Sequence, residues 1–261
     1  MLWSVEERDG IVVATYTNPP MNYMVAPAVA QLAELVADWE REAVRAVILT
    51  GGVEGRFITH YSVEELAEMA QHPEAEMQAT NRAYQDFVLR LRRLAKPVIM
   101  AMNGDTMGGG FELAMGADIR ILQAGDHRVG LPEVRLGILP GGGGTQLLPR
   151  LIGLAKASEF ILRGRIVTPD VALALGLVHE VVPDALARAR DIAADLSRQS
   201  GYAIAKAKQA LYSGFDAAIE TGVLIESDAF CNTMRSARGQ DRMRAYLTHD
   251  FDARRATLES D

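Results

Sequence analysis

Two carboxylates, Glu112 and Glu133, stand in sequence surroundings that suit acid–base catalysis. Glu112 lies in the first turn of an expected helix, which the glycine run 108–110 opens. Glycines at such a place leave backbone N–H groups bare, and bare N–H groups at a helix N-terminus bind anions or oxyanions. Glu133 follows Pro132 among apolar residues, which disfavour a charged carboxylate and therefore suit a general acid.

Each feature, taken alone, also has a purely structural interpretation. The three glycines could serve only to let the helix pack closely on a strand, with Glu112 complementing the helix dipole. Glu133 could be an ordinary carboxylate at the edge of a surface loop. The two segments must therefore be judged together with the elements that position them.

Apolar strands alternate with amphipathic helices along the chain, which predicts α/β architecture. β-branched residues predict strands over 11–16 and 44–50, and the apolar run 97–102 predicts a strand covered on both faces. Apolar residues at helical spacing predict helices over 26–42 and 74–94.

The remaining sequence is less regular. Residues 57–62 predict an irregular loop, ahead of an acidic helix over 63–70. A further strand is predicted over 118–122. Beyond Thr145 nearly everything predicts helix, apart from a short strand over 177–182.

The composition fits one soluble globular protein. The chain has 261 residues, of which 49% are hydrophobic and 23% are charged. A net charge of −7 does not provide the basic footprint of a nucleic-acid-binding protein, and no apolar run is long enough to span a membrane. A single cysteine, Cys231, and an N-terminus that is acidic where a signal peptide would be basic favour the cytoplasm.

Several other kinds of site lack their motifs. The glycine run 141–144 is not followed by the lysine of a phosphate loop, and neither glycine run matches a dinucleotide fingerprint. The five histidines include no i, i+4 pair, and one cysteine cannot build a zinc knuckle. There is also no Gly-x-Ser-x-Gly elbow of an α/β-hydrolase.

Two ordered blocks of the sequence resemble the crotonase family, the enoyl-CoA hydratase/isomerase group. The first block, 99–119, contains a strand, Asn-Gly, the three glycines and Glu112. The second block, 131–150, contains Pro-Glu-Val-Arg-Leu-Gly and the run of four glycines. A shorter block follows over 164–178, and the resemblance as a whole covers about 12–210.

This resemblance implies an α/β fold, a spiral of repeated ββα units with a helical C-terminal region. The core would span 1–200 and a helical trimerisation region would span 201–261. It implies a homotrimer, or a hexamer made of two trimers. It also implies an acyl-CoA substrate, with coenzyme A as part of that substrate, and neither a metal nor a redox cofactor.

Residue by residue, the resemblance implies an oxyanion hole made by the backbone N–H groups of Gly109 and Tyr61, which would stabilise a developing enolate. Glu112 would deprotonate a water that attacks Cβ, and Glu133 would deliver a proton to Cα. Isomerases of the family typically keep only the carboxylate that matches Glu133, so the pair favours an enoyl-CoA hydratase. We also expect substrate contacts from five neighbouring positions, which are Thr59, His60, Gly108, Pro132 and Gly141.

The segment 57–62 departs from the family pattern. Most members read roughly Phe-x-Ala-Gly-Ala-Asp there, whereas His60, Tyr61 and Ser62 replace the last Gly, Ala and Asp in this chain. A residue other than glycine resists positive φ, so the loop is expected to bend differently. In one interpretation His60 and Tyr61 reshape the acyl or CoA pocket while hydration continues. In the other they serve isomerisation or another enolate reaction, or they spoil the oxyanion hole and leave a non-catalytic acyl-CoA-binding protein.

Overall fold

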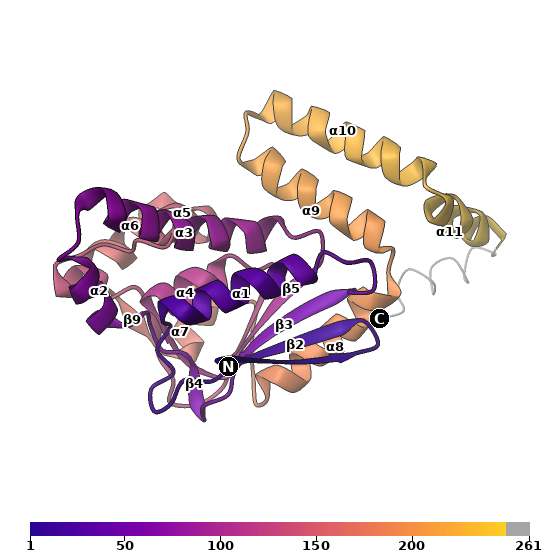
Figure 1. Cartoon of the computed structure of the whole chain (residues 1–261). Helices are drawn as coiled ribbons and strands as arrows, with labels where there is room; N and C mark the ends of the chain where they lie inside the picture. The colour runs from indigo at the N-terminus through magenta and orange to yellow at the C-terminus, as the bar shows by residue number, and fades with distance from the viewer. Residues whose placement is uncertain (249–261) are drawn as a thin grey trace. The chain divides into compact units, whose positions relative to one another are not determined.

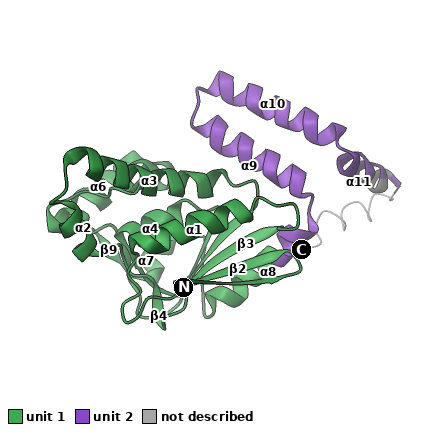
Figure 2. Cartoon of the chain, viewed as in Figure 1, with its two compact units in different colours: residues 1–193 green, residues 194–261 purple. Residues whose placement is uncertain are grey.

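The computed structural model describes residues 1–248 of the chain, which form parts of two compact units (Figure 2). Unit 1 spans Met1–Ala193 and unit 2 begins at Ala194. The sequence predicts a helical region from residue 201 onward, and the last part of that region, 249–261, lies outside the described residues.

The larger sheet of unit 1 has six strands in the order β1-β2-β3-β5-β7-β10. β1 and β2 are antiparallel, and the other neighbours run parallel. The strands are β1 (Trp3–Arg8), β2 (Ile11–Tyr16), β3 (Ala46–Gly51), β5 (Val98–Met102), β7 (Ile119–Gln123) and β10 (Glu180–Val182).

The buried strands of this sheet confirm the sequence-based predictions. Every residue of β5 is buried, as its unbroken apolar run predicts for a strand covered on both faces. β1 is not predicted from the sequence, because Trp3 is the one buried residue of that strand and the other five residues are exposed. Asp9 and Gly10, both at positive φ, form the tight turn that pairs β1 with β2.

A smaller sheet has four strands in the order β4-β6-β8-β9. They are β4 (Gly55–Ile58), β6 (Gly104–Met107), β8 (Val129–Gly130) and β9 (Ile166–Val167). The predicted loop 57–62 is therefore wrong at its first two residues, which end β4. β9 likewise interrupts the region beyond Thr145, where the sequence predicts almost only helix. Such short strands are specified by pairing with distant segments, which local sequence patterns do not reveal.

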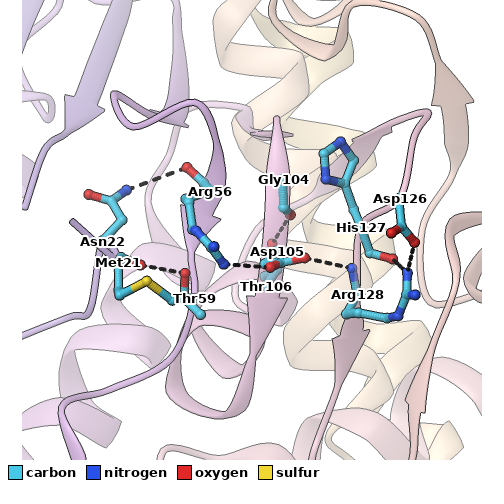
Figure 3. Close-up of polar contacts among 10 residues, drawn as sticks. All are labelled: Met21, Asn22, Arg56, Thr59, Gly104, Asp105, Thr106, Asp126, His127 and Arg128. Carbon is cyan, nitrogen blue, oxygen red and sulfur yellow. Dashed lines mark hydrogen bonds and ion pairs between the residues drawn. The ribbon is translucent and has the colours of Figure 1, made fainter. Parts of the chain in front are cut away.

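Asp105, in the middle of β6, ties the smaller sheet together (Figure 3). Its Oδ2 lies 2.7 Å from Nη1 of Arg56 in β4, and its Oδ1 accepts a hydrogen bond from the backbone N–H of Arg128. Asn22 donates a hydrogen bond to the carbonyl of Arg56. β4, β6 and the start of β8 are thus linked by side chains as well as by the backbone hydrogen bonds of the sheet.

Successive ββα units place one strand in each sheet before the chain turns into a helix. The strand pairs are β3–β4, β5–β6 and β7–β8, and this repeat confirms the predicted spiral of ββα units. The helical elements of unit 1 are α1 (Ala26–Asp38), α2 (Val63–Met69), α3 (Glu74–Arg93), α4 (Gly108–Met115), η1 (Glu133–Leu136), α5 (Gly144–Ile152), α6 (Leu154–Leu162) and α7 (Pro169–Leu175).

α1 and α3 lie side by side next to the larger sheet (Figure 1). The inner face of α3 contributes Tyr84, Phe87, Val88 and Leu91 to the core, at the spacing expected for one buried stripe. The two helices that the sequence predicts over 26–42 and 74–94 are therefore confirmed, although the first ends earlier, at Asp38.

Helix α8 (Ala185–Arg198) crosses the boundary between the units. Unit 2 continues with α9 (Gly201–Phe215), α10 (Ile219–Arg235) and α11 (Ala237–Thr248), which confirms the predicted helical character. α9 and α10 pack closely at Gly214 and Gly222, where an added Cβ on Gly222 would lie 3.1 Å from the Gly214 carbonyl. In the described chain no helix has the length and apolar character needed to cross a membrane.

Candidate active site

Three parallel strands of the smaller sheet end at the same edge and bring the candidate residues together. β4 runs parallel to β6, and β6 runs parallel to β8. Tyr61 follows β4, Gly109 follows β6 and Glu133 follows β8. Because the carboxyl ends of parallel strands meet at one edge, residues far apart in the sequence share one site, as is usual in α/β proteins.

A cavity of about 790 Å³ opens at this edge. Its wall contains all of the predicted site residues except Thr59, namely His60, Tyr61, Gly108, Gly109, Glu112, Pro132, Glu133 and Gly141. The rest of the wall is largely apolar. It comes mostly from α1, α2 and α3, with side chains such as Val29, Leu66, Met69, Met77 and Phe87, and also from the end of η1 and the residues after it, with Leu136, Ile138 and Leu139. An apolar wall with a few polar groups is typical of a small-molecule site.

The Tyr61 N–H is oriented by the strand-like segment at Met24. The Met24 N–H donates to the His60 carbonyl over 2.8 Å, and the Ser62 N–H donates to the Met24 carbonyl over the same distance. In a planar trans peptide the N–H points opposite to the C=O, so the Tyr61 N–H points away from Met24. An added Cβ on Gly109 would lie 3.5 Å from the Tyr61 nitrogen, which places these two backbones against each other.

Gly109 is the second residue of α4, and the first four N–H groups of a helix have no acceptor within it. The N–H groups of Gly109 and Tyr61 are therefore two neighbouring backbone donors beside the cavity. Such a pair can bind a negatively charged oxygen.

Tyr84 supports this helix start from α3. Its buried hydroxyl donates to the Gly109 carbonyl over 2.7 Å, and its ring meets the Tyr61 ring edge-on with centroids 5.8 Å apart. Burial raises the pKa of the Tyr84 hydroxyl well above its usual value, so it remains a donor. Tyr84 is not among the predicted site residues, since its helical spacing is typical of a packing residue and no sequence signal indicates a role for its hydroxyl.

Glu112 is held by the second glycine run. Its Oε1 accepts hydrogen bonds from the N–H groups of Gly142, at 2.8 Å, and Gly144, at 2.7 Å. An added Cβ on Gly144 would lie 2.9 Å from the same oxygen, so the approach requires glycine. The run is recognisable in the sequence as part of a motif, but its N–H groups could not be identified there as partners of Glu112.

Burial raises the pKa of Glu112 to about 7. The N–H of Gly144 acts in the opposite direction, the negative charge of Glu133 raises the pKa further, and the N–H of Gly142 lowers it. The directions of these pKa shifts follow from a general rule: burial disfavours a charged carboxylate, whereas hydrogen bonds donated to it favour the charge.

Glu133 begins η1 and is buried, with a relative exposure of 8%. Neither carboxyl oxygen has a hydrogen-bond partner within the described residues. Burial raises its pKa to about 7; its own backbone N–H opposes this shift without reaching hydrogen-bond geometry. An added Cβ on Gly108, which has φ +49°, would lie 3.1 Å from Oε1 of Glu133, so this carboxyl group faces the start of α4.

The two carboxyl groups are thus prepared for different protonation states. Two donated hydrogen bonds favour the ionised form of Glu112, whereas the unpartnered oxygens of Glu133 favour the neutral acid. Because both groups titrate in the same range and interact, their macroscopic pKa values belong to the pair. Two carboxyl groups that titrate near neutral pH therefore line one cavity, where they can exchange protons with a ligand.

The unusual loop keeps an ordinary backbone. In the described chain Asp9 and Asn22 are the non-glycine residues with positive φ, so His60 does not adopt the positive φ that glycine tolerates. Ser62 caps α2, because its Oγ accepts the Glu65 N–H over 3.1 Å. The polar residues of this loop therefore have local structural partners.

The other predicted contact residues differ in position. Thr59 is buried behind the cavity wall and donates its hydroxyl to the Met21 carbonyl, so it holds the loop from behind (Figure 3). Pro132 and Gly141 line the cavity, and the Gly141 carbonyl accepts a hydrogen bond from Nε2 of Gln85 over 2.7 Å. Across the described residues no cluster of three or more His, Cys, Asp or Glu side chains could hold a metal ion.

Comparisons with known proteins show which family the chain resembles. The family model for enoyl-CoA hydratase/isomerase matches residues 6–251. The chain is 34% identical to a short-chain-enoyl-CoA hydratase of Clostridium acetobutylicum, over 92% of this chain and 93% of that protein.

Solved structures show the same likeness. The enoyl-CoA hydratase of Bacillus anthracis superposes with a TM-score of 0.88 at 28% identity, over 95% of this chain and 96% of that one. An enoyl-CoA hydratase structure from Geobacillus kaustophilus gives a TM-score of 0.90 at 26% identity, over 95% and 94% of the two chains. The chain therefore belongs to the enoyl-CoA hydratase/isomerase family, the crotonase family of enzymes.

Proposed function

We propose that this enzyme adds water across the double bond of a 2-enoyl-CoA thioester. The observation that carries the proposal is the unequal pair of carboxyl groups beside two backbone donors. Within the described residues Glu112 accepts two N–H bonds, which favour its ionised state, whereas Glu133 accepts none, which favours the neutral acid. Hydration needs both a base for water and an acid for carbon.

The proposed reaction starts with the thioester oxygen bound by the N–H groups of Gly109 and Tyr61. Glu112 removes a proton from a water molecule, and the water oxygen bonds to Cβ. The π electrons of the double bond move toward the thioester oxygen, where the two donors stabilise the enolate. The proton of Glu133 then bonds to Cα as the enolate collapses. One water is consumed, and the Glu112 proton must return to Glu133 or pass through solvent before the next cycle.

The apolar wall supports an acyl group as the part of the substrate that enters the cavity. Side chains of α1, α2 and α3 line it, and they offer few partners for a polar substituent. The short-chain-enoyl-CoA hydratase of Clostridium acetobutylicum is named for an acyl-CoA substrate of the same chemical class.

The proposal is tested by product analysis. Purified protein is mixed with but-2-enoyl-CoA, a medium-chain 2-enoyl-CoA and an aryl 2-enoyl-CoA, and the products are analysed by mass spectrometry and NMR. We expect a gain of one water with the hydroxyl group on Cβ. A product of unchanged mass with a shifted double bond would replace hydration by isomerisation, and binding without any turnover would contradict both.

We also propose that the protein assembles as a homotrimer, or as a hexamer made of two trimers. The helices of unit 2 support this, because several large apolar side chains on them are exposed, including Leu211, Phe215, Leu224 and Phe230. Exposed apolar patches of this kind mark interaction surfaces. Size-exclusion chromatography with light scattering measures the mass of the assembly in solution and tests the proposal. The mass of a monomer would contradict it.

A further inference from the structure

His60 contacts the backbone of the residue whose N–H is the proposed oxyanion donor. Its Nδ1 lies 2.7 Å from the carbonyl oxygen of Tyr61. A carbonyl oxygen only accepts hydrogen bonds, so Nδ1 carries the proton and donates it. The contact closes a small ring of atoms that contains the peptide bond between His60 and Tyr61, the peptide that carries the Tyr61 N–H.

The imidazole ring is held in turn by Tyr23. The two rings stack with centroids 4.2 Å apart and an interplanar angle of 27°. The Tyr23 carbonyl accepts hydrogen bonds from the hydroxyl of Tyr16, at 2.6 Å, and from Nδ2 of Asn18, at 2.8 Å. The main chain of Tyr23 is therefore anchored to the end of β2, and the Tyr23 ring provides the surface on which the imidazole stacks.

Met24, the residue after Tyr23, holds the main chain on both sides of Tyr61. It binds the His60 carbonyl and the Ser62 N–H, which leaves the Tyr61 carbonyl facing away from it. That remaining carbonyl is the one that His60 Nδ1 binds. The peptide group that follows Tyr61 thus has a second hydrogen bond, from His60, and this bond closes the ring that contains the Tyr61 N–H.

We propose that His60 is a positioning residue that aims the Tyr61 N–H at the thioester oxygen. Glycine, which the family pattern has here, could not make this contact. A donor fixed before the reaction stabilises a developing oxyanion without reorganisation during the reaction. The inference rests on the proposed function insofar as the Tyr61 N–H serves as an oxyanion donor.

Two substitutions at His60 separate the hydrogen bond from the stacking. His60→Phe keeps an aromatic ring against Tyr23 but removes the donor, whereas His60→Asn keeps an N–H at the place of Nδ1 but removes the ring. We expect His60→Phe to lower kcat for hydration about tenfold with KM within about twofold, since one hydrogen bond that matters in the transition state is worth about a factor of ten. His60→Asn should recover most of this loss.

A second readout does not depend on hydration. Acetoacetyl-CoA loses a proton from Cα to form an enolate that absorbs in the near ultraviolet, and an oxyanion hole raises the fraction of that enolate. We expect the wild-type protein to lower the apparent pKa of bound acetoacetyl-CoA. In His60→Phe the lowering of this apparent pKa should be smaller by about one pH unit. In His60→Asn the lowering should be close to that of the wild-type protein.

The outcomes distinguish the inference from the proposed function. If the wild-type protein does not hydrate enoyl-CoA but stabilises the enolate through His60, hydration fails and the inference stands. If the wild-type protein does not stabilise the enolate, or if His60→Phe leaves both kcat and the enolate fraction unchanged, the inference is overturned. A failure of His60→Asn to recover either readout would also overturn it.

The melting temperature and the circular dichroism spectrum of each variant show whether it folds. If His60→Phe does not fold, His60→Leu removes the donor with a smaller apolar side chain and is compared with His60→Asn in the same way. Tyr202→Phe, on an exposed position of α9, serves as an unrelated aromatic control.

Discussion

Glu112 and Glu133 line the same cavity, but in the part of the chain that the structure describes Oε1 of Glu112 accepts two backbone hydrogen bonds and neither oxygen of Glu133 accepts any. Hydrogen bonds to a carboxylate favour its charged form, whereas a buried carboxyl group without them favours the neutral acid. Burial is the largest cause that raises the pKa of each group to about 7, and for Glu112 this value includes the effect of the two hydrogen bonds. From the hydrogen bonding we propose Glu112 as the base and Glu133 as the acid of the pair.

Replacing the base should stop the attack of water. We expect Glu112→Gln to lower kcat for hydration by about 10² to 10⁴, because the amide cannot accept the proton from water. The measurement is the initial rate of loss of enoyl-thioester absorbance. Glu74→Gln, at the exposed start of α3, is the matched control and should retain the wild-type rate.

The rate should depend on pH with a maximum close to neutrality. The active form has Glu112 ionised and Glu133 protonated, so protonation of Glu112 removes activity below about pH 7 and ionisation of Glu133 removes it above about pH 7. The profile of kcat/KM should therefore be bell-shaped, with apparent values that belong to the pair. A profile that is flat from pH 5 to pH 9 would contradict this assignment.

The free energy of unfolding should also depend on the ionisation of Glu133, and it should fall as pH rises. The pKa of Glu133 is raised in the folded protein from 4.5 to about 7, so the folded state binds this proton more tightly than the unfolded chain does. The resulting stability is complete below pH 4.5 and is lost as pH rises through about 7. Glu133→Gln does not ionise, so its free energy of unfolding relative to wild type should rise by about 2 kcal/mol between pH 5 and pH 8.

Denaturant unfolding of both proteins at the two pH values measures this difference, and the comparison removes any effect of the amide that does not depend on pH. A relative stability of Glu133→Gln that falls as pH rises would mean that the folded protein stabilises the charged form of Glu133.

Removing the Tyr84 hydroxyl should weaken the start of α4. Tyr84→Phe leaves the ring in place but deprives the buried Gly109 carbonyl of its donor, which costs about 1–3 kcal/mol. We expect a lower melting temperature and a kcat reduced about twofold to tenfold. Tyr202→Phe provides the comparison for a surface hydroxyl, and equal behaviour of the two variants would argue against this role for Tyr84.

Much of the frame could be predicted from local sequence. β5 and α3 could each be predicted from a single segment of sequence. A strand buried on both faces is apolar throughout, and a helix buried on one face has apolar residues at helical spacing. Glu112 and Glu133 could also be selected, because each stands next to glycine or proline in a recognisable block.

The rest depends on contacts between distant segments. β4 forms because it pairs with β6, about fifty residues later, and its own sequence is too short to show a period. The same holds for the hydrogen bonds from Gly142 and Gly144 to Glu112, which require the cavity to close. The role of His60 could not be read from its type, since its meaning depends on the carbonyl and the ring beside it.

The central claim is that Glu133 supplies the proton in an enoyl-CoA hydration, and the most direct test is the turnover of Glu133→Gln. Initial rates with but-2-enoyl-CoA, medium-chain and aryl 2-enoyl-CoA esters are compared for wild type, for this variant and for Glu159→Gln, a surface control whose carboxylate pairs with Arg165. We predict rapid loss of thioester conjugation with wild type and with Glu159→Gln. We predict a rate lower by about two to three orders of magnitude with folded Glu133→Gln. Turnover of Glu133→Gln near the wild-type rate would contradict the account.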